Sequence, residues 1–184
     1  MPGGNEVVQP INALIKRFDH VVLTQDWHPD DHSSFAARHE GKEPFHTTEM
    51  PYGTQTLWPD HCVQGTPGAE FHTDLDVTKS QLIIRKGFRA HIDSYSAFYE
   101  NDRDTPTGLA GYLRERGYDK VVLAGLATDF CVGHSALDAA RHGFKTTVVM
   151  DACRAIDLDG SLAAAEAQMR AAGVVLTESV SLAA

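Results

Sequence analysis

The sequence has few cysteines, few basic residues and no long apolar run, the features that mark disulfide-rich, nucleic-acid-binding and membrane proteins. Its 184 residues include only three cysteines, Cys62, Cys131 and Cys153, an odd number without the spacing of a disulfide framework. The chain has 16 Lys and Arg and 25 Asp and Glu, which gives a net charge of -9. This acidic balance argues against binding to nucleic acid or to a membrane surface. No apolar run approaches the roughly 20 residues of a membrane span, and Met1 precedes Pro-Gly-Gly instead of a signal peptide. These absences predict a cytoplasmic protein with a single domain over residues 1–184.

Strand and helix patterns alternate along most of the chain. Apolar, β-branched runs predict strands at residues 21–24, 82–86, 120–126, 146–150 and 174–177. Periodic apolar positions and capping residues predict helices at residues 11–18, 108–116, 131–141 and 161–172. Residues 29–79 lack periodicity, and so long an irregular stretch in a compact domain is usually functional or disordered. The alternation predicts an α/β fold, a doubly wound, mainly parallel sheet with helices on both faces.

Chemically reactive side chains lie at the ends of three predicted strands. Asp26 and His28 follow the first strand, Lys86 ends the second, and Cys131 follows the third. In open sheets of this kind, ligands bind beyond the carboxyl ends of the strands. We therefore expect these four residues to share one rim of the sheet, although they are far apart in sequence.

Cys131 lies where a strand gives way to a helix. Free backbone N–H groups and the helix dipole at such a position favour the thiolate, and the same N–H groups suit an oxyanion during acyl transfer. A lysine on a neighbouring strand, such as Lys86, would lower the thiol pKa further. The alternative is that Cys131 is a small buried hydrophobe, as most free cysteines are; Cys62 and Cys153 are interpreted in that way.

A metal site is the second hypothesis for this rim. Along an extended segment alternate side chains point the same way, so Asp26 and His28 face a common point. His61, in the long irregular region, is the best candidate for a third ligand. One Asp and two His leave open coordination positions, as a catalytic metal requires. The alternative is that Asp26 caps a turn and His28 is solvated; His32 is left open as a fourth ligand, a hydrogen-bond partner or neither.

Five segments in a fixed order carry a family resemblance. They read TQDWHPDDHSSFA, LWPDHCVQGTPGAEFH, IIRKGFRAHIDSYSAF, GLATDFCVGHSALDA and DACRAID. On these segments, which cover nearly the whole chain, the sequence resembles the nicotinamidase (pyrazinamidase) family of cysteine hydrolases within the isochorismatase-like superfamily. The resemblance implies hydrolysis of nicotinamide to nicotinate and ammonia through a thioester, as a step of NAD salvage.

The resemblance also implies a role for residues of the third and fourth segments. Cys131 would be the nucleophile, and Lys86 the cation that stabilises its thiolate. The backbone N–H groups of Ala127 and Cys131 would form the oxyanion hole, and the Leu126–Ala127 peptide bond would be cis.

The remaining implied roles concern the substrate ring. Asp26, His28 and His61 would hold one divalent metal ion, zinc, iron or manganese, which holds the pyridine nitrogen of the substrate. Trp58 and Tyr95 would be walls of a flat ring pocket. Nicotinamide is then the expected small-molecule partner, and homo-oligomerisation is left open.

The sequence departs from the family at its beginning. The family opens with a buried central strand that ends in D-x-Q-N-D-F, whose first Asp is the general base, and nothing upstream of Ile11 matches it. We therefore expect a chain truncated at the N-terminus relative to the family, with Met1 as an internal start codon the preferred explanation. The alternatives are a catalytically impaired member that binds metal and ligand, or another isochorismatase-like hydrolase; the Asp26, His28 and His61 set argues against the latter.

Overall fold

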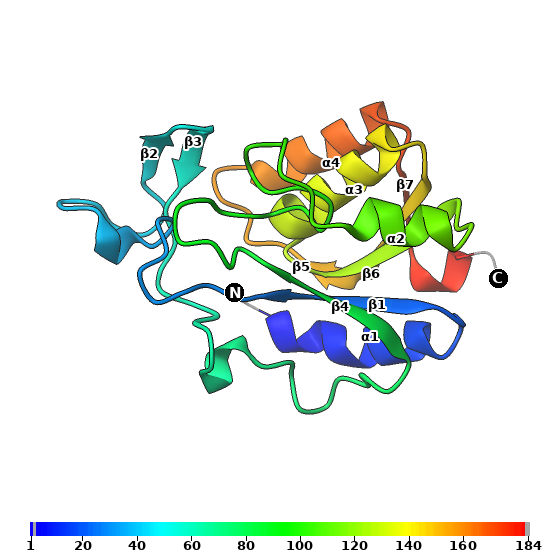
Figure 1. The fold of residues 1–184 in the computed structure, drawn as a ribbon. Helices are drawn as coiled ribbons and strands as arrows, with labels where there is room; N and C mark the ends of the chain where they lie inside the picture. The colour runs from blue at the N-terminus through cyan, green and yellow to red at the C-terminus, as the bar shows by residue number, and fades with distance from the viewer. Residues whose placement is uncertain (2, 183–184) are drawn as a thin grey trace.

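Five parallel strands form the centre of the computed structural model, which describes residue 1 and residues 3–182 (Figure 1). They fall into two groups. The first group pairs β1 (Val21–Asp26) with β4 (Ser80–Lys86). The second has the order β5 (Lys120–Leu126), β6 (Lys145–Arg154) and β7 (Val175–Thr177). All of the predicted strands are present, and β1, β4 and β6 extend beyond their predicted limits.

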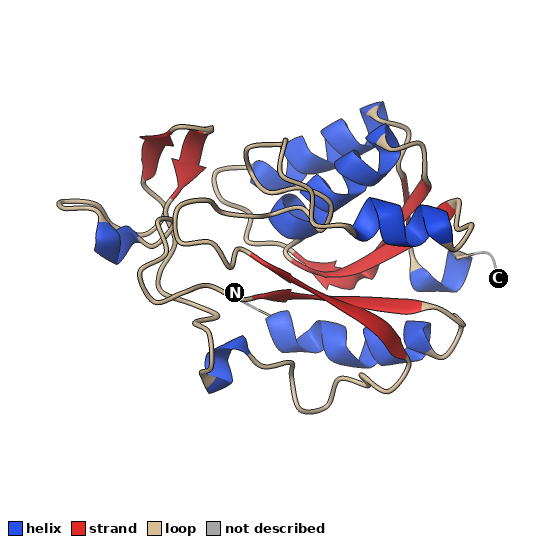
Figure 2. Ribbon diagram, in the orientation of Figure 1, coloured by secondary structure: helices blue, strands red, loops and turns tan. Residues whose placement is uncertain are grey.

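Helices cover both faces of these strands (Figure 2). Helix α1 (Val8–Ile15) lies on one face; α2 (Leu109–Glu115), α3 (Gly133–Arg141) and α4 (Ser161–Ala171) lie on the other. Short 3-10 turns cover Gly4–Val7, Ala36–Arg38, Pro67–Ala69 and Ser179–Ser181. The doubly wound α/β arrangement is therefore as predicted.

The two faces of β6 show why this strand is a continuous apolar run. Val148 packs in a cluster with Met169 of α4, whereas Val149 packs on the opposite face against Leu14 of α1. Both valine side chains are completely buried. Consecutive strand residues point to opposite faces, so a strand covered on both sides needs apolar residues at every position.

The two groups of strands are joined by helices. Within residues 3–182, no backbone hydrogen bond connects the β1–β4 pair with the β5–β6–β7 sheet. Instead Ile84 of β4 packs in one cluster with Leu113 of α2 and Ala139 of α3, and Val121 of β5 packs against the same cluster. The sheet is thus divided, and its halves are held together by side-chain packing on the α2–α3 face.

The irregular region contains one element that the sequence analysis did not predict. Strands β2 (Thr47–Met50) and β3 (Gly53–Thr56) form an antiparallel hairpin that projects from the body of the molecule (Figure 1). Its strands are short and polar, so they carry no apolar alternation from which a strand could be recognised. Separately, no helix among the described residues has the length and apolar character needed to cross a bilayer.

The core around α4 yields a stability prediction. Met169 is 0% exposed, and Met169→Ala should lower the free energy of unfolding by about 2–5 kcal/mol, because the substitution removes buried atoms and leaves a cavity. Urea unfolding followed by circular dichroism measures this change.

The control is Val175→Ala in β7, where the side chain is 57% exposed and the expected change is about 0.5 kcal/mol or less. Equal destabilisation by the two substitutions would contradict the packing described for α4.

Candidate active site

The carboxyl ends of β1, β4 and β5 meet at one rim of the fold. Asp26 is the last residue of β1 and lies in register beside Lys86, the last residue of β4. Strand β5 ends at Leu126 and is followed by the turn that carries Cys131. The prediction that Asp26, His28, Lys86 and Cys131 share one rim is confirmed by this geometry.

Lys86 connects the groups at this rim. Its ammonium group lies 3.3 Å from Cys131 Sγ and donates a hydrogen bond to Ser94 O at 2.9 Å. It also forms an ion pair with Asp26. The lysine is only 4% exposed, so the Asp26 carboxylate supplies the negative charge that a buried ammonium group requires.

The pKa values of Lys86, Asp26 and Cys131 depend on their burial and on the charges that they exert on one another. Burial alone would lower the pKa of Lys86, but the interactions with Asp26, Cys131 and Asp93 together outweigh it and raise that pKa. Burial alone would raise the pKa of Asp26, but the positive charge of Lys86 lowers it below its ordinary value. Burial raises the pKa of the Cys131 thiol to about 11, more than Lys86 lowers it. The expected depression of the thiol pKa is therefore wrong for this structure, although Lys86 acts in the predicted direction.

The turn that carries Cys131 follows directly after β5. The Leu126–Ala127 peptide bond is cis, as the family resemblance implied. Ala127 O then accepts hydrogen bonds from the N–H groups of Phe130 at 3.1 Å and Val132 at 3.0 Å. The resulting turn, Thr128–Val132, is π-helical and leads directly into α3, which begins at Gly133 and not at Cys131.

Asp129 fixes this turn to the rest of the fold. Its carboxylate accepts hydrogen bonds from the N–H groups of Ile156 at 3.0 Å and Asp157 at 2.7 Å, and from the Ser161 hydroxyl. These three partners leave Asp129 with a structural role. Cys153, 3% exposed, packs in the α3–α4 core, and all three cysteines are free thiols.

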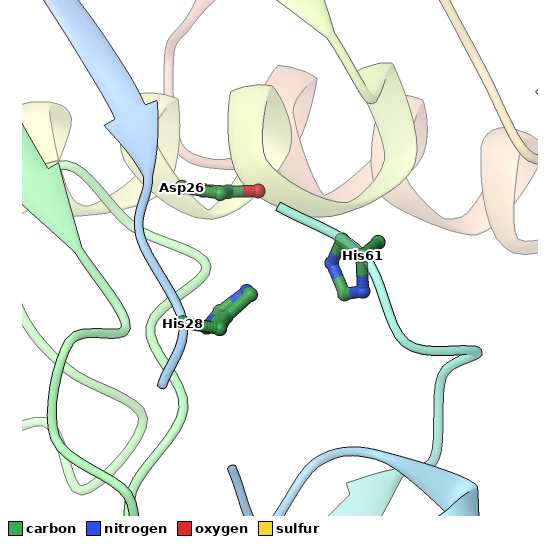
Figure 3. A group of neighbouring side chains, drawn as sticks. All are labelled: Asp26, His28 and His61. Atoms are coloured by element: carbon green, nitrogen blue, oxygen red, sulfur yellow. The ribbon is translucent and has the colours of Figure 1, made fainter. Parts of the chain in front are cut away.

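Asp26, His28 and His61 converge at one point (Figure 3). One ligand atom from each residue lies within 4.8 Å of the others, although His61 is more than 30 positions from the other two in the chain. The predicted set of three candidate ligands is thus brought together by the structure.

Backbone carbonyl groups orient both imidazole rings. His28 Nδ1 lies 2.8 Å from Gly87 O, and His61 Nδ1 lies 2.8 Å from Pro59 O. Each Nδ1 must therefore carry the hydrogen, which leaves the lone pair of Nε2 for a metal ion. Burial also lowers the pKa of His28 to about 4, so this ring stays neutral, as a ligand must. The donor set fits a divalent metal.

His32 has a different environment. It forms a second group of ligand-type atoms with His28 and Asp93, again within 4.8 Å. However, His32 Nε2 lies 3.2 Å from Ile92 O, and its Nδ1 accepts the Ser34 N–H at 3.3 Å. With both nitrogens engaged, His32 is a hydrogen-bond partner in this structure, one of the three options that the sequence left open.

Three aromatic rings lie close together near the Cys131 segment. Trp58 and Tyr95, the two predicted ring-pocket residues, are edge to face with a centroid separation of 6.2 Å. Phe130, the residue before Cys131, lies 4.8 Å from Trp58 and 5.5 Å from Tyr95. Phe130 was not predicted as a site residue. Its position directly before the candidate nucleophile in a strand-to-helix turn is the signal by which it could have been found.

Comparisons with known proteins identify the family of the chain. The isochorismatase domain family matches residues 1–180 of the chain. The nicotinamidase of Acinetobacter baylyi is 56% identical over 94% of this chain and 84% of its own length. The chain belongs to the nicotinamidase family within the isochorismatase-like superfamily.

Solved structures of this family superpose closely on the chain. The Acinetobacter baumanii nicotinamidase/pyrazinamidase has a TM-score of 0.97 and 58% identity, covering 98% of this chain and 87% of that one. The Pyrococcus horikoshii pyrazinamidase, solved in complex with zinc, has a TM-score of 0.77 and 33% identity, covering 97% and 88%. The predicted fold and family are confirmed by these matches.

The contact between Gly87 and His28 yields a prediction on metal binding. A Cβ atom at Gly87 would lie 2.3 Å from His28 Cε1 and 2.6 Å from Nδ1. Gly87→Ala should therefore displace the imidazole and weaken zinc binding by about tenfold or more, the usual effect of losing a partner that orients a ligand. Calorimetric titration of the metal-free protein with zinc measures the affinity.

Gly117→Ala is the matched control. Gly117 has a similar positive φ of 72° but open space around the added Cβ, so its strain is comparable and its zinc affinity should not change. Zinc binding by Gly87→Ala at wild-type affinity would exclude the proposed orientation of His28.

The thiol pKa yields a prediction on pH dependence. Because the pKa of Cys131 is raised to about 11, the thiolate fraction at neutral pH is small and grows as the pH rises. Alkylation of Cys131 by iodoacetamide in the metal-free protein should accelerate about tenfold per pH unit between pH 7 and 9. Mass spectrometry of the Cys131 peptide measures the rate, with Cys131→Ala as the blank, and a plateau below pH 8 would contradict the raised pKa.

Proposed function

We propose that the chain hydrolyses nicotinamide to nicotinate and ammonia. The observation that carries this proposal is a continuous line of contacts from Cys131 Sγ through Lys86 to Asp26, which lies beside His28 and His61. These contacts support the proposal, because a ligand held at the histidines would lie near the sulfur. The relatives matched over most of their length carry the name nicotinamidase, which supports this substrate.

Cys131 is the nucleophile in this proposal. Its sulfur attacks the carboxamide carbon of nicotinamide, the C–N bond breaks, and ammonia leaves with the proton that the thiol gives up. Water then attacks the thioester carbon, which releases nicotinate and restores the thiol. Lys86, positively charged and 3.3 Å from the sulfur, stabilises the thiolate while the proton is absent.

Asp26 has a second role beyond the one that the family resemblance implied. It was expected to act at the metal, and the structure adds its ion pair with Lys86. A carboxylate has two oxygens, so one can hold the lysine while the other faces His28 and His61. Asp26 therefore keeps Lys86 charged and beside Cys131, in addition to serving as a candidate ligand.

The backbone N–H groups of Ala127 and Cys131 are proposed to form the oxyanion hole. The Ala127 N–H belongs to the cis peptide bond, and the Cys131 N–H lies within the π-helical turn that carries the sulfur. Donors held in place by the backbone need no rearrangement when negative charge develops on the carboxamide oxygen.

Asp26, His28 and His61 would hold a divalent ion, which would supply a coordination position for the pyridine nitrogen of the substrate. Zinc, iron and manganese all suit two imidazole nitrogens and a carboxylate, and the zinc-bound Pyrococcus horikoshii pyrazinamidase supports zinc. Trp58, Tyr95 and Phe130 hold the ring from the sides, which leaves its carboxamide toward Cys131.

The expected setting of the enzyme also belongs to this proposal. Three free thiols suit a reducing cytoplasm, and a net charge of -9 suits neither nucleic acid nor an anionic membrane. We expect a single catalytic domain that takes a small-molecule substrate, with or without self-association.

The proposal predicts ammonia release from nicotinamide by the metal-loaded protein. Cys131→Ala should abolish this release, because it removes the sulfur that forms the thioester, and a coupled glutamate dehydrogenase assay measures it. Cys153→Ala, which removes a thiol from the α3–α4 core, should retain it.

Ammonia release that survives Cys131→Ala would refute the assigned nucleophile. Wild-type protein that binds nicotinamide without releasing ammonia would instead identify a ligand-binding member of the family. A panel that includes a linear amide distinguishes nicotinamide hydrolysis from another amidase activity.

A further inference from the structure

The β2–β3 hairpin is attached to the body of the protein in an unusual way. It projects at one side of the fold, beyond the ends of the central strands (Figure 1). Of the eight residues in its two strands, all of them described, only Gln55 is buried, with 1% of its surface exposed. A polar side chain, and not an apolar cluster, therefore forms the buried contact of the hairpin strands.

The amide nitrogen of Gln55 lies among three acceptors. Nε2 is 2.9 Å from Asp93 Oδ2, 2.9 Å from Tyr95 Oη and 2.7 Å from Thr56 O. The Asp93 carboxylate accepts hydrogen bonds and donates none when ionised, so it fixes which end of the amide faces it. The orientation of Gln55 is thus determined by its surroundings.

The amide oxygen of Gln55 completes the network. Oε1 accepts hydrogen bonds from Asn101 Nδ2 at 3.1 Å and from the Tyr52 hydroxyl at 3.3 Å. Asn101 in turn accepts the Tyr95 N–H at 3.0 Å through Oδ1 and donates its own N–H to Asp93 O at 2.8 Å. Gln55, Asn101 and Tyr95 therefore form a closed ring of hydrogen bonds, which holds the hairpin against residues 93–101.

This network ends at the aromatic pocket. The Tyr95 hydroxyl oxygen accepts a hydrogen bond from Gln55 and another from Trp58 Nε1, at 3.1 Å. Trp58 follows Gln55 by three residues in the chain, so the same segment supplies the anchor and one wall. Loss of the Gln55 amide would remove one of the two donors to Tyr95 Oη and the donor to Asp93 Oδ2, and with them the side-chain anchor of the segment that leads to Trp58.

We propose that Gln55 is a positioning residue that sets the separation of Trp58 and Tyr95 and thereby the fit of the substrate ring. This inference rests on the proposed function, because it concerns the pocket assigned to nicotinamide. Among the described residues, the Gln55 side chain makes no hydrogen bond to Cys131 or Lys86. It therefore acts on ring binding and not on the thiol.

The test compares Gln55→Met, which keeps the length of the side chain but removes its hydrogen bonds, with wild-type protein. KM for nicotinamide should rise about tenfold and nicotinate affinity should fall by the same factor, as for loss of a buried polar contact. The alkylation rate of Cys131 should stay within about twofold of wild type, because Lys86 and Asp26 are unchanged. A merely structural role would change the alkylation rate as well.

A charge exchange provides the rescue. Gln55→Glu alone places a carboxylate against Asp93 and should impair ring binding at least as much as Gln55→Met. In the double variant Gln55→Glu with Asp93→Asn, the new amide at position 93 donates a hydrogen bond to the new carboxylate at position 55. This reversed bond should recover most of the nicotinate affinity.

Gln81→Met is the matched control, since Gln81 makes its hydrogen bonds at the opposite end of β4 from Lys86. It should leave KM unchanged. A folded Gln55→Met protein with wild-type KM, or a double variant no better than Gln55→Glu, would overturn the inference. Wild-type protein without ammonia release would refute the proposed function instead, and nicotinate affinity would still report on Gln55.

Discussion

The positive charge of Lys86 is buried, and the arrangement of the site depends on the ion pair that balances this charge. Its ion pair with Asp26 joins the ends of β1 and β4, and its third contact reaches Cys131 on the turn after β5. Removing either partner of such a pair leaves a buried, uncompensated charge, which is strongly unfavourable. The ion pair therefore holds together groups that arrive from three strands and keeps the thiol next to a fixed cation.

Around this pair, the backbone determines how side chains are presented. The carbonyl groups of Gly87 and Pro59 accept hydrogen bonds from Nδ1 of His28 and His61, which leaves the Nε2 lone pair of each ring available. The same principle applies to the aromatic pocket, where Gln55 holds Tyr95 through a buried amide. In both places, polar contacts specify an orientation that apolar packing alone would leave adjustable, because a hydrogen bond has a preferred direction and the hydrophobic effect has none.

Periodicity and strand ends were sufficient to predict the parallel strands, the helices on both faces and the common rim of Asp26, His28, Lys86 and Cys131. They could not place His61, whose position depends on the path of an irregular segment; that assignment came from spacing and family resemblance. The hairpin and Gln55 were missed because polar strands have no apolar alternation. The thiol pKa was misjudged, since the extent of burial around Cys131 is a property of tertiary packing that no local pattern reveals.

The divided sheet has a mechanical consequence for the site. The cation and the three candidate ligands belong to the half that contains β1 and β4, whereas the sulfur belongs to the half that contains β5. A small sliding of one half past the other, at the interface where Ile84 meets α2 and α3, would change the distance between sulfur and ammonium without altering either half internally. Agents that loosen this interface would separate the reacting groups while most of the secondary structure stays intact.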